Sequence, residues 1–572
     1  MRVLGVNAVF HDPAAALVVD GEIVAAAEEE RFNRRKHGKE NVAFSGWEMP
    51  SAAARWCLER AGLTPSDVDA VAFSFDPALC EPAVQLGLDD PWDHLRQEYA
   101  RRAPYLLATA LPGLDPDRAH MVAHHVAHAA SAALAGPYRT SACLVLDGRG
   151  ERASHLSAHY VDGELTPLAA QRLPSSLGLL YEDLTAHLGF HRSSDEYKVM
   201  ALASYGRPAH LDAFRELVRT TPDGGFVVEP VDWSSFAPAR SRRESQEGRQ
   251  VSRAHADLAA TVQRRLEEVL LDLARWLHER TGERHLTMAG GTALNCVANA
   301  VVLRDGPFED LWVQPAAGDA GTALGAALHV ARAHGELGAP MTSAALGRSF
   351  SDDDVEAALT TARLPFERPA SLAATVGAEL AADRVVAWFQ GRAEYGPRAL
   401  GQRSLLAHPG RAENLERLND IKGREQFRPV APLVLLERAE DVMTGQVPSP
   451  FMLFVHEVHE QWRDLVPAVV HVDGTARAQT VDRRTQPLLA AVLEEFEART
   501  GLPVLVNTSL NTAGRPIVDS PHDVLELFGS SPVDVLVVGP FVVRRWDVAP
   551  AEVTVPDVAP AEVATAALEG VA

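Results

Sequence analysis

The chain presents the same local succession twice: a strand, a turn of small residues and a hairpin. In the first copy, apolar residues 3–7 and 14–19 precede an Asp-Gly pair at 20–21 and the apolar residues 23–27. In the second copy, the segment CLVLD (143–147) precedes two extended runs around an Asp-Gly pair at 162–163. Asp-Gly between apolar runs is a strong hairpin signal, and its recurrence in this setting predicts two related half-domains.

The remainder of the chain alternates strands and helices. A long amphipathic helix is expected over 251–281, followed by a strand at 285–290, a helix at 291–303 and a strand at 311–316. Such alternation favours an α/β fold. A polar, proline-containing stretch at 346–370 predicts a linker between a first domain, 1–345, and a second, 371–547. The Pro-, Ala- and Val-rich tail from 548 to 572 is expected to be disordered.

The charge balance excludes several classes of protein. Acidic residues outnumber basic ones 77 to 54, which gives a net charge of −23. A general nucleic-acid or anionic-membrane binder needs a basic surface, although a local phosphate pocket remains compatible with this balance. No apolar run approaches a membrane span, and four scattered cysteines form neither a disulfide framework nor a CxxC pair. We expect a soluble, cytoplasmic protein with no nucleic-acid or membrane partner.

Two histidines and two aspartates are candidate metal ligands. His124 and His128 lie four residues apart in a helical pattern, so both imidazoles share one face. Asp147 ends an apolar strand, and Asp319 stands at the Gly-rich start of a helix. Such a set suits Fe²⁺, Mn²⁺, Zn²⁺ or Mg²⁺. The alternative is a helix with ordinary core or solvated histidines.

Three glycine-rich or turn segments, at 7–15, 147–151 and 289–295, are candidate phosphate-binding turns. Backbone amides at tight turns and helix starts can bind phosphate oxygens, and glycine lets those oxygens approach. None matches GxGxxG or a Walker A motif, so each taken alone is equally compatible with a plain turn. Their order, two hairpin units followed by a strand, a Gly-Gly turn and a helix, is the order expected of an actin/hexokinase-type nucleotide cleft.

Basic residues gather at turns in the second half of the chain. Arg398, Arg403, Lys422, Arg428 and Arg477 all lie beside glycine, proline or turn residues. In an acidic protein this grouping predicts a site for a small anion, since arginine recognises phosphate in a bidentate manner. Asn507 and Asn511 follow an apolar strand, where their amides could orient a planar carbonyl group or serve as turn formers. Scattered solvated arginines are the alternative.

Longer motifs carry a resemblance to a known family. They are VFHDPAAALVVDGEIVAAAEEERFNRRKHG, HHVAHA, LVLDGRGE, SLGLLYEDLTAHLGF, DEYKVMALASYG, GGTALNCVAN, GDAGTALGAAL, GPRALGQRS, KGREQFRP, HVDGTARAQTV and NTSLN. In this order, from Met1 to about Val543, they resemble the NodU/CmcH carbamoyltransferases, which include O-carbamoyltransferases of antibiotic biosynthesis.

The resemblance implies a fold and a reaction. Residues 1–345 would form a TsaD-like domain of the actin/hexokinase superfamily with duplicated subdomains, and 371–547 a YrdC-like domain. Family members transfer the carbamoyl group of carbamoyl phosphate to a hydroxyl, with ATP and a divalent metal. Carbamoyl phosphate is first cleaved to carbamate, ATP converts carbamate to carbamoyl-adenylate, and the hydroxyl displaces AMP.

The resemblance also implies roles for individual residues. His124, His128, Asp147 and Asp319 fall on the metal positions, with Fe²⁺ the expected ion and Mn²⁺ or Mg²⁺ as alternatives. His11 would assist proton removal from the attacking hydroxyl, and Lys36 would counter phosphate charge. The nucleotide is assigned to Asp12, Gly148, Gly290, Gly291, Asn295 and Gly318. Carbamoyl phosphate is assigned to Arg398, Lys422, Arg428, Arg477 and Asn507.

Two other functions stay open at this point. One is transfer of threonylcarbamoyl to tRNA, against which the charge of −23 weighs. The other is a nucleotide-binding sensor without turnover. The expected partners are carbamoyl phosphate, ATP and a hydroxylated small molecule of secondary metabolism, with a homodimer as a further expectation. The identity of the acceptor, and the role of an insertion-like segment at 41–50, cannot be read from the residues.

Overall fold

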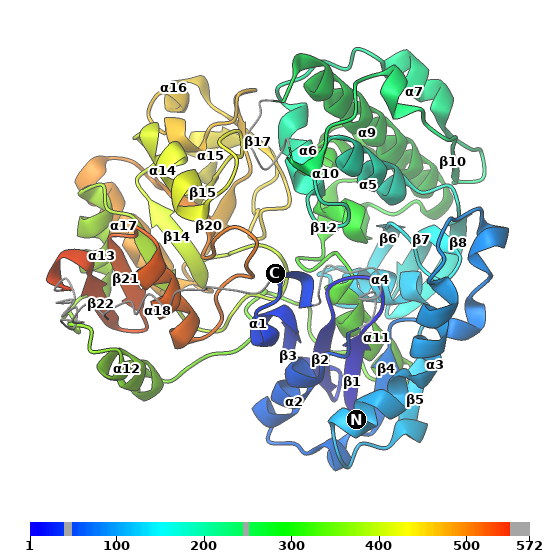
Figure 1. Ribbon diagram of the computed structural model, residues 1–572, viewed down its shortest axis with the longest axis horizontal. Coiled ribbons are helices and arrows are strands. Elements are labelled where there is room, and N and C mark those ends of the chain that lie inside the picture. Colours follow the sequence, from blue (N-terminus) through cyan, green and yellow to red (C-terminus); the bar gives the residue numbers. More distant parts are fainter. Residues whose placement is uncertain (39–47, 244–250, 549–572) are drawn as a thin grey trace, which may run out of the picture.

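The first hairpin unit builds a five-stranded mixed sheet in the computed structural model, which describes residues 1–38, 48–243 and 251–548. Its strands are β1 (Arg2–Asn7), β2 (Ala14–Val19), β3 (Glu22–Glu28), β4 (Ala70–Phe73) and β5 (Ala119–Met121). Their order is β3-β2-β1-β4-β5 (Figure 1). Strand β1 pairs antiparallel with β2 and parallel with β4, and β4 pairs parallel with β5.

The second hairpin unit repeats this topology. Its strands are β6 (Thr140–Leu146), β7 (Ala153–Val161), β8 (Glu164–Arg172), β11 (His285–Ala289) and β12 (Asp310–Val313), in the order β12-β11-β6-β7-β8. Strand β6 pairs antiparallel with β7 and parallel with β11, and β11 pairs parallel with β12. Strand order and strand direction therefore match between the two sheets, which confirms the repeated pattern of the sequence.

Two helices lie between the sheets: α4 (His124–Ala133) and α11 (Ala320–Ala333). Their alanine-rich faces pack on inward-facing residues of β1, β2, β6 and β7. Small residues are needed here because the backbones approach closely. A Cβ atom on Gly325 would lie 1.8 Å from the Ala127 carbonyl oxygen, and one on Gly5 would lie 1.9 Å from that of Ala323. These contacts fix the ends of α4 and α11 relative to the strand ends, where the candidate metal ligands lie.

Further helices cover the outer faces of both sheets. Helices α2 (Ser51–Arg60) and α3 (Asp93–Ala110) cover the first sheet. Helices α5 (Leu177–His187), α9 (Arg253–Thr281) and α10 (Cys296–Asp305) cover the second. The helix expected over 291–303 is divided into a short 3₁₀ turn, η7 (Gly291–Leu294), and α10. The division falls at Asn295, whose side-chain oxygen accepts the Ala298 amide at 3.0 Å and so caps α10.

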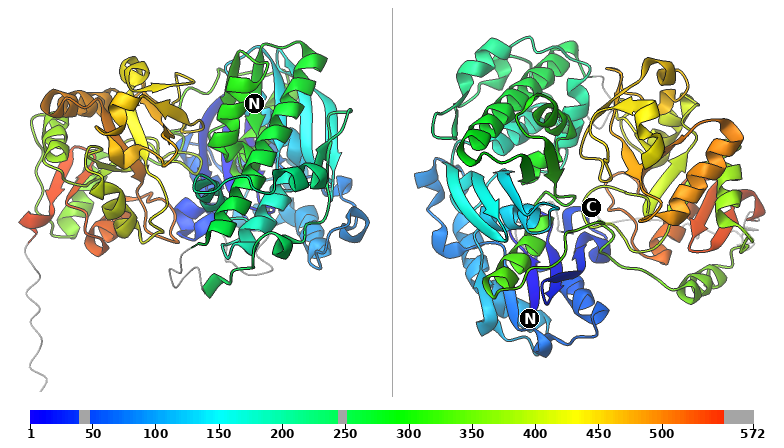
Figure 2. Two further views of the ribbon diagram at one scale, coloured as in Figure 1. Left: turned by 90° about the horizontal axis from the view of Figure 1, so that it is seen from above. Right: turned by 180° about the vertical axis from the view of Figure 1, so that it is seen from behind.

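The C-terminal part, coloured yellow to red in Figure 2, contains a seven-stranded sheet. Its strand order is β19-β15-β20-β14-β13-β21-β22. The strands are β13 (Val386–Phe389), β14 (Arg403–Ala407), β15 (Ala431–Leu435), β19 (Gln479–Val481), β20 (Val504–Ser509), β21 (Val535–Val538) and β22 (Phe541–Arg544). Helices α13 (Leu372–Ala381) and α17 (Pro487–Thr500) pack on one face. Helices α12 (Asp352–Thr361), α14 (Glu413–Lys422) and α18 (Pro521–Ser530) pack on the other. The mixed α/β class is confirmed.

The segment 346–370, expected as a linker, carries α12. Val355 and Leu359 of this helix are buried in the core of the C-terminal part. No helix of the described residues has the length and apolar character needed to cross a membrane. The tail from 549 and positions 41–47 of the insertion-like segment lie outside the described residues.

Candidate active site

The four candidate metal ligands come together at one point. His124 and His128 lie on the first and second turns of α4, Asp147 follows β6, and Asp319 immediately precedes α11. His124 Nε2 lies 3.3 Å from Asp147 Oδ2 and 3.6 Å from Asp319 Oδ1, and His128 Nε2 lies 3.6 Å from the same Asp319 oxygen. One ligand atom from each of the four residues falls within 4.8 Å of all the others. All four side chains are buried.

The chemistry of these residues fits a divalent cation. Neither ring nitrogen of His128 has a hydrogen-bond partner among the described residues, although the side chain is fully buried. Such an orphaned polar atom is costly unless a ligand binds it. The His124 Nδ1 atom contacts the Ser74 carbonyl oxygen at 3.2 Å, which directs Nε2 toward the two carboxylates. Two imidazoles and two carboxylates suit Fe²⁺, Mn²⁺ or Zn²⁺.

The electrostatics of the cluster also favour the binding of a cation. Burial lowers the pKa of His124, but hydrogen bonds and charges from Asp147 and Asp319 outweigh burial and raise this pKa well above its usual value. Burial raises the pKa of Asp147, but the two histidines outweigh it and hold this pKa far below its usual range. The carboxylates are therefore held in their charged form, as a cation site requires.

His11 and Asp12 form a second polar group beside the cluster, together with His37. One carboxylate oxygen of Asp12 lies 2.9 Å from His11 Nδ1, and the other lies 2.9 Å from His37 Nδ1. The His11 backbone amide donates to Asp319 Oδ2 at 3.1 Å, which joins this group to the metal cluster. Lys36 Nζ lies 3.5 Å from Glu30 Oε2. His37 was not among the residues selected from the sequence; its position next to Lys36 in RRKHG was the available signal.

The predicted nucleotide turns converge on Asp147. The Gly291 amide donates to Asp147 Oδ1 at 2.9 Å. Gly290 has φ +92°, and a Cβ atom there would lie 2.1 Å from the Leu146 carbonyl oxygen, so this turn needs glycine. Gly148 and Gly318 line the same cavity. The Asn295 side chain, in contrast, is used within the fold, because it caps α10 and also exchanges hydrogen bonds with Gln263.

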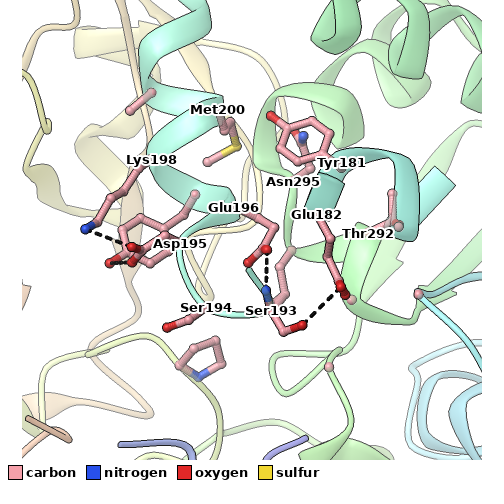
Figure 3. A pocket seen from close by; sticks show the side chains of 18 of the residues that line it. Tyr181, Glu182, Ser193, Ser194, Asp195, Glu196, Lys198, Met200, Thr292 and Asn295 are labelled. Atoms are coloured by element: carbon pink, nitrogen blue, oxygen red, sulfur yellow. Dashed lines mark hydrogen bonds and ion pairs between the residues drawn. The ribbon is translucent and has the colours of Figure 1, made fainter. Parts of the chain in front are cut away.

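A pair of acidic side chains lines this end of the cavity and was missed in the sequence. Figure 3 shows Glu182, from α5, and Glu196, at the start of α6 (Glu196–Ala203), on either side of Ser193. Ser193 Oγ donates to Glu182 at 3.0 Å, and the Ser193 amide donates to Glu196 at 2.7 Å. A Cβ atom on Gly148 would lie 3.3 Å from Glu182, so this carboxylate stands directly beside a predicted phosphate turn.

Several basic residues of the C-terminal part form a cluster. Arg398, Arg428 and Arg477 line the cavity, as does Arg424, which was not selected from the sequence. The Nε atoms of Arg398 and Arg477 are buried and have no hydrogen-bond partner in the described part of the chain. Burial and repulsion from Arg477 lower the pKa of Arg398 to about 9. Cations held together at such a cost are typical of an anion site.

Two residues from the same sequence group, Arg403 and Lys422, make other contacts than the direct anion contact expected of them. Arg403 is fully buried away from the cavity, donates to the Gln390 carbonyl at 2.6 Å and packs on the Phe389 ring. The Lys422 ammonium lies behind the cavity wall and donates to Asn511 Oδ1 at 2.7 Å and Ser509 Oγ at 3.0 Å. Asn507, in contrast, lines the cavity; its amide nitrogen donates to Gln479 at 2.8 Å, while its Oδ1 has no partner among the described residues.

Residues of α6 complete the basic cluster from the N-terminal part. The Arg428 guanidinium lies over the Tyr197 ring, 4.5 Å from its centroid. Lys198 Nζ lies 2.8 Å from Glu425, whereas Arg428 lies 3.5 Å from the same carboxylate. Lys198 therefore shares the Glu425 carboxylate with Arg428.

One continuous cavity of about 2070 Å³ joins these groups. Its lining includes Asp147 and Asp319 of the metal cluster, the turns at Gly148 and Gly291, and Arg477 of the basic cluster. Both parts of the chain contribute to its walls, and Gly396 near the junction donates to Glu28 at 2.6 Å. The fold and the site thus define a duplicated α/β protein in which a buried two-His, two-Asp cluster and a cluster of arginines open into a shared space.

Comparison with known proteins identifies the family. Models of the carbamoyltransferase N-terminus and the carbamoyltransferase C-terminus match residues 2–328 and 377–545. The chain belongs to the carbamoyltransferase family, which confirms the resemblance found in the motifs and makes the protein a transferase.

Several relatives are similar along most of their length. Nodulation protein NolNO of Sinorhizobium fredii is 38% identical over 96% of this chain and 81% of its own. Nodulation protein U of the same species is 32% identical over 90% of this chain and 94% of its own. Among solved structures, T. kodakarensis HypF is matched with a TM-score of 0.34 and 13% identity, covering 58% of this chain and 48% of HypF.

Proposed function

We propose that the protein is an ATP-dependent O-carbamoyltransferase. It moves the carbamoyl group of carbamoyl phosphate, through carbamate and carbamoyl-adenylate, to a hydroxyl of a small secondary metabolite such as an antibiotic precursor. The observation that carries this proposal is the shared cavity, which contains a cluster of arginines at one end and a two-His, two-Asp cluster beside glycine turns at the other. Two chemically different sites in one space suit a reaction in two stages.

The basic cluster would bind carbamoyl phosphate. Arg398, Arg428 and Arg477 offer planar, fixed donors for the phosphate oxygens, and the Asn507 oxygen can accept from the carbamoyl NH₂ group. These cations stabilise the phosphate as it leaves, so that water converts the donor to carbamate and inorganic phosphate. The Nε atoms of Arg398 and Arg477 have no hydrogen-bond partner among the described residues, so they are available to the anion.

The other end of the cavity would activate the carbamate. Carbamate is a poor electrophile because its anionic oxygen donates electron density to the carbonyl carbon. Attack of a carbamate oxygen on the α-phosphate of ATP releases pyrophosphate and gives carbamoyl-adenylate, whose leaving group is AMP. A divalent ion held by His124, His128, Asp147 and Asp319 would act as a Lewis acid toward phosphate and carbamoyl oxygens.

Residues of this chain would place the nucleotide. The turns at Gly148 and Gly291, which line the cavity, would lie against the phosphates. The Glu182 carboxylate, beside Gly148, is positioned to accept hydrogen bonds from ribose hydroxyls. Lys36 would offset the phosphate charge.

His11 would act as the base for the acceptor hydroxyl. Its Nδ1 atom is held by Asp12, which assigns the proton-accepting role to Nε2. The hydroxyl oxygen then attacks the carbamoyl carbon, the bond to AMP breaks, and the proton passes to the imidazole. The His11 backbone amide donates to the Asp319 carboxylate, so the proposed base lies next to the two-His, two-Asp cluster.

Product analysis tests the proposal. The purified protein is incubated with ATP, carbamoyl phosphate, Fe²⁺ under anaerobic conditions and a panel of hydroxylated metabolites, and mass spectrometry follows each acceptor. We expect one acceptor to gain a carbamoyl group in place of a hydrogen, with equimolar AMP and pyrophosphate. Carbamoyl transfer at an unchanged rate without ATP would contradict the adenylate stage, and formation of threonylcarbamoyl-tRNA would favour the alternative acceptor.

A further inference from the structure

Ser194, His37 and Asp12 form a linear chain of hydrogen bonds at the wall of the cavity. Ser194 Oγ lies 2.7 Å from His37 Nε2, and His37 Nδ1 lies 2.9 Å from Asp12 Oδ1. All three residues line the cavity. They come from three separate segments: Asp12 precedes β2, His37 lies in η1 (Lys36–Gly38), and Ser194 precedes α6. Figure 3 shows Ser194 at the edge of the site, next to Ser193.

This geometry assigns a direction to each hydrogen bond. The carboxylate can only accept, so the His37 Nδ1 atom carries the proton and Nε2 is left as the acceptor for the Ser194 hydroxyl. Burial, together with the neighbouring His11, lowers the pKa of His37 to about 4, which keeps its imidazole neutral and able to accept a proton at neutral pH. A hydroxyl bonded to a base that is in turn oriented by a carboxylate is the arrangement that activates serine as a nucleophile.

The local backbone gives independent support for a functional role. Phe10, Asp12, His37 and Ser193 all have positive φ, at 65°, 43°, 61° and 59°, although none is glycine. Left-handed backbone is unfavourable for such residues and collects at functional sites, where the surroundings enforce it. Here it occurs within or next to each of the three segments that supply the chain of hydrogen bonds.

We propose that Ser194 is a nucleophile that takes up a carbamoyl group, with His37 as its base and Asp12 as the positioning residue for His37. Ser194 Oγ attacks the carbamoyl carbon of an activated carbamoyl ester or mixed anhydride, forming an O–C bond. The bond from that carbon to the leaving oxygen breaks, and the Ser194 proton passes to His37 Nε2. Water or an acceptor hydroxyl then releases the group from Ser194. Carbamoyl-adenylate as the donor within the protein rests on the proposed function.

Two donors distinguish this proposal from the proposed function. The first is p-nitrophenyl carbamate, which needs neither ATP nor metal and releases p-nitrophenolate on attack. The second is carbamoyl phosphate with ATP and Fe²⁺. The full-length protein is treated with each donor without acceptor, digested and analysed by peptide mass spectrometry. We expect the peptide containing Ser194 to gain one carbamoyl group in place of a hydrogen with both donors.

Variants test the roles separately. Ser194→Ala abolishes the modification, and His37→Gln slows it by about 100-fold or more, the typical contribution of a general base. The matched control is Ser204→Ala, a cavity-lining serine whose hydroxyl bonds the Ala201 carbonyl within α6, and it retains the modification. Should Ser194→Ala fail to fold, Ser194→Cys and peptide mapping of the unaltered protein give the same information.

Each outcome separates the two claims. If p-nitrophenyl carbamate modifies Ser194 but carbamoyl phosphate with ATP and Fe²⁺ does not, the result supports Ser194 as a nucleophile. It also counts against carbamoyl-adenylate as the natural donor. Modification by neither donor, in a preparation that forms AMP from ATP and carbamoyl phosphate, overturns the role of Ser194 while the proposed function stands. An equal rate of modification in His37→Gln overturns the role of His37.

Discussion

The His11 backbone amide donates a hydrogen bond to Asp319 Oδ2 at 3.1 Å, while Asp319 Oδ1 lies 3.6 Å from both His124 and His128. One carboxylate therefore connects the predicted base to the predicted metal site, although 308 positions separate the two residues in the chain. The connection follows from the duplicated fold, because β1 and α11 pack closely and bring the loop after β1 to the start of α11. The His11 backbone is thereby tied to a carboxylate that would hold the cation.

His128 is expected to be essential for metal binding. In His128→Gln the cluster loses a nitrogen donor that has no other partner among the described residues, so Fe²⁺ affinity should fall by more than the 10–100-fold typical of outer-shell changes. The matched control is His125→Gln, a buried histidine of the same helix outside the cluster. Anaerobic titration of each purified variant measures the effect. Equal affinity in His128→Gln and the unaltered protein would refute this ligand set.

Metal binding should also depend on pH in a defined direction. The Asp147 and Asp319 carboxylates overcome the effect of burial and raise the pKa of His124, so the metal-free cluster carries a proton there near neutral pH. A cation must displace that proton, and its affinity should fall as the pH falls, by up to about tenfold per pH unit. Titration calorimetry in buffers of different ionisation enthalpy measures the released proton. Metal uptake without proton release would contradict the charge state assigned to His124.

Lys198 is expected to maintain the anion site from the opposite part of the chain. Lys198→Met leaves the whole charge of Glu425 to Arg428, which we expect to weaken phosphate binding by about tenfold. Replacing both residues, Lys198→Met with Glu425→Gln, should restore binding because the competing carboxylate is gone. Lys198→Arg keeps the charge and serves as the control. Phosphate titrations of the four proteins decide, and a double variant as weak as Lys198→Met would argue against this mechanism.

The turn at Gly290 should tolerate no side chain. Gly290→Ala introduces a Cβ atom 2.1 Å from the Leu146 carbonyl oxygen at a φ of +92°. Gly335→Ala is the matched control, since its φ of +89° is similar and nothing lies within 4 Å of the added atom. The control should lose about 1–2 kcal/mol of stability from the left-handed backbone alone. Gly290→Ala should lose about 1–3 kcal/mol more from overpacking, in addition to the cost of its own backbone conformation, φ 92° and ψ 158°, which is essentially confined to glycine. Similar melting temperatures for the two variants would disprove the steric argument.

Local patterns in the sequence predict a large part of this fold. The hairpins at the Asp-Gly pairs, the amphipathic α9 and the strand β11 follow from turn chemistry and apolar periodicity, and the structure contains all of them. The boundary at Asn295 was not predicted, because a capping asparagine inside a helical pattern looks like any other polar position until its partners are known. The YrdC-like assignment of the C-terminal part and the domain boundaries stay predictions.

The candidate site could be predicted only where several polar or titratable side chains lie within one short motif. The i, i+4 spacing of His124 and His128 marks a shared helix face, and the structure places both beside Asp147 and Asp319. The involvement of His37, Glu182 and Lys198 depends on contacts with residues that are distant in sequence, which no local pattern encodes. For Arg403, the sequence suggested an anion contact that the structure does not show. A turn-associated arginine looked available for an anion, yet its guanidinium satisfies backbone carbonyls.

The most direct test of the account measures phosphate and AMP together in three forms of the protein, supplied with carbamoyl phosphate, ATP and Fe²⁺. If the two ends of the cavity carry consecutive stages, Asp319→Asn should still release phosphate from carbamoyl phosphate but form no AMP. Arg477→Gln should release neither, while the unaltered protein releases both. Carbamoyl-phosphate-dependent AMP formation by Arg477→Gln at the rate of the unaltered protein would contradict the account, because the donor would then be reaching the metal end without the basic cluster.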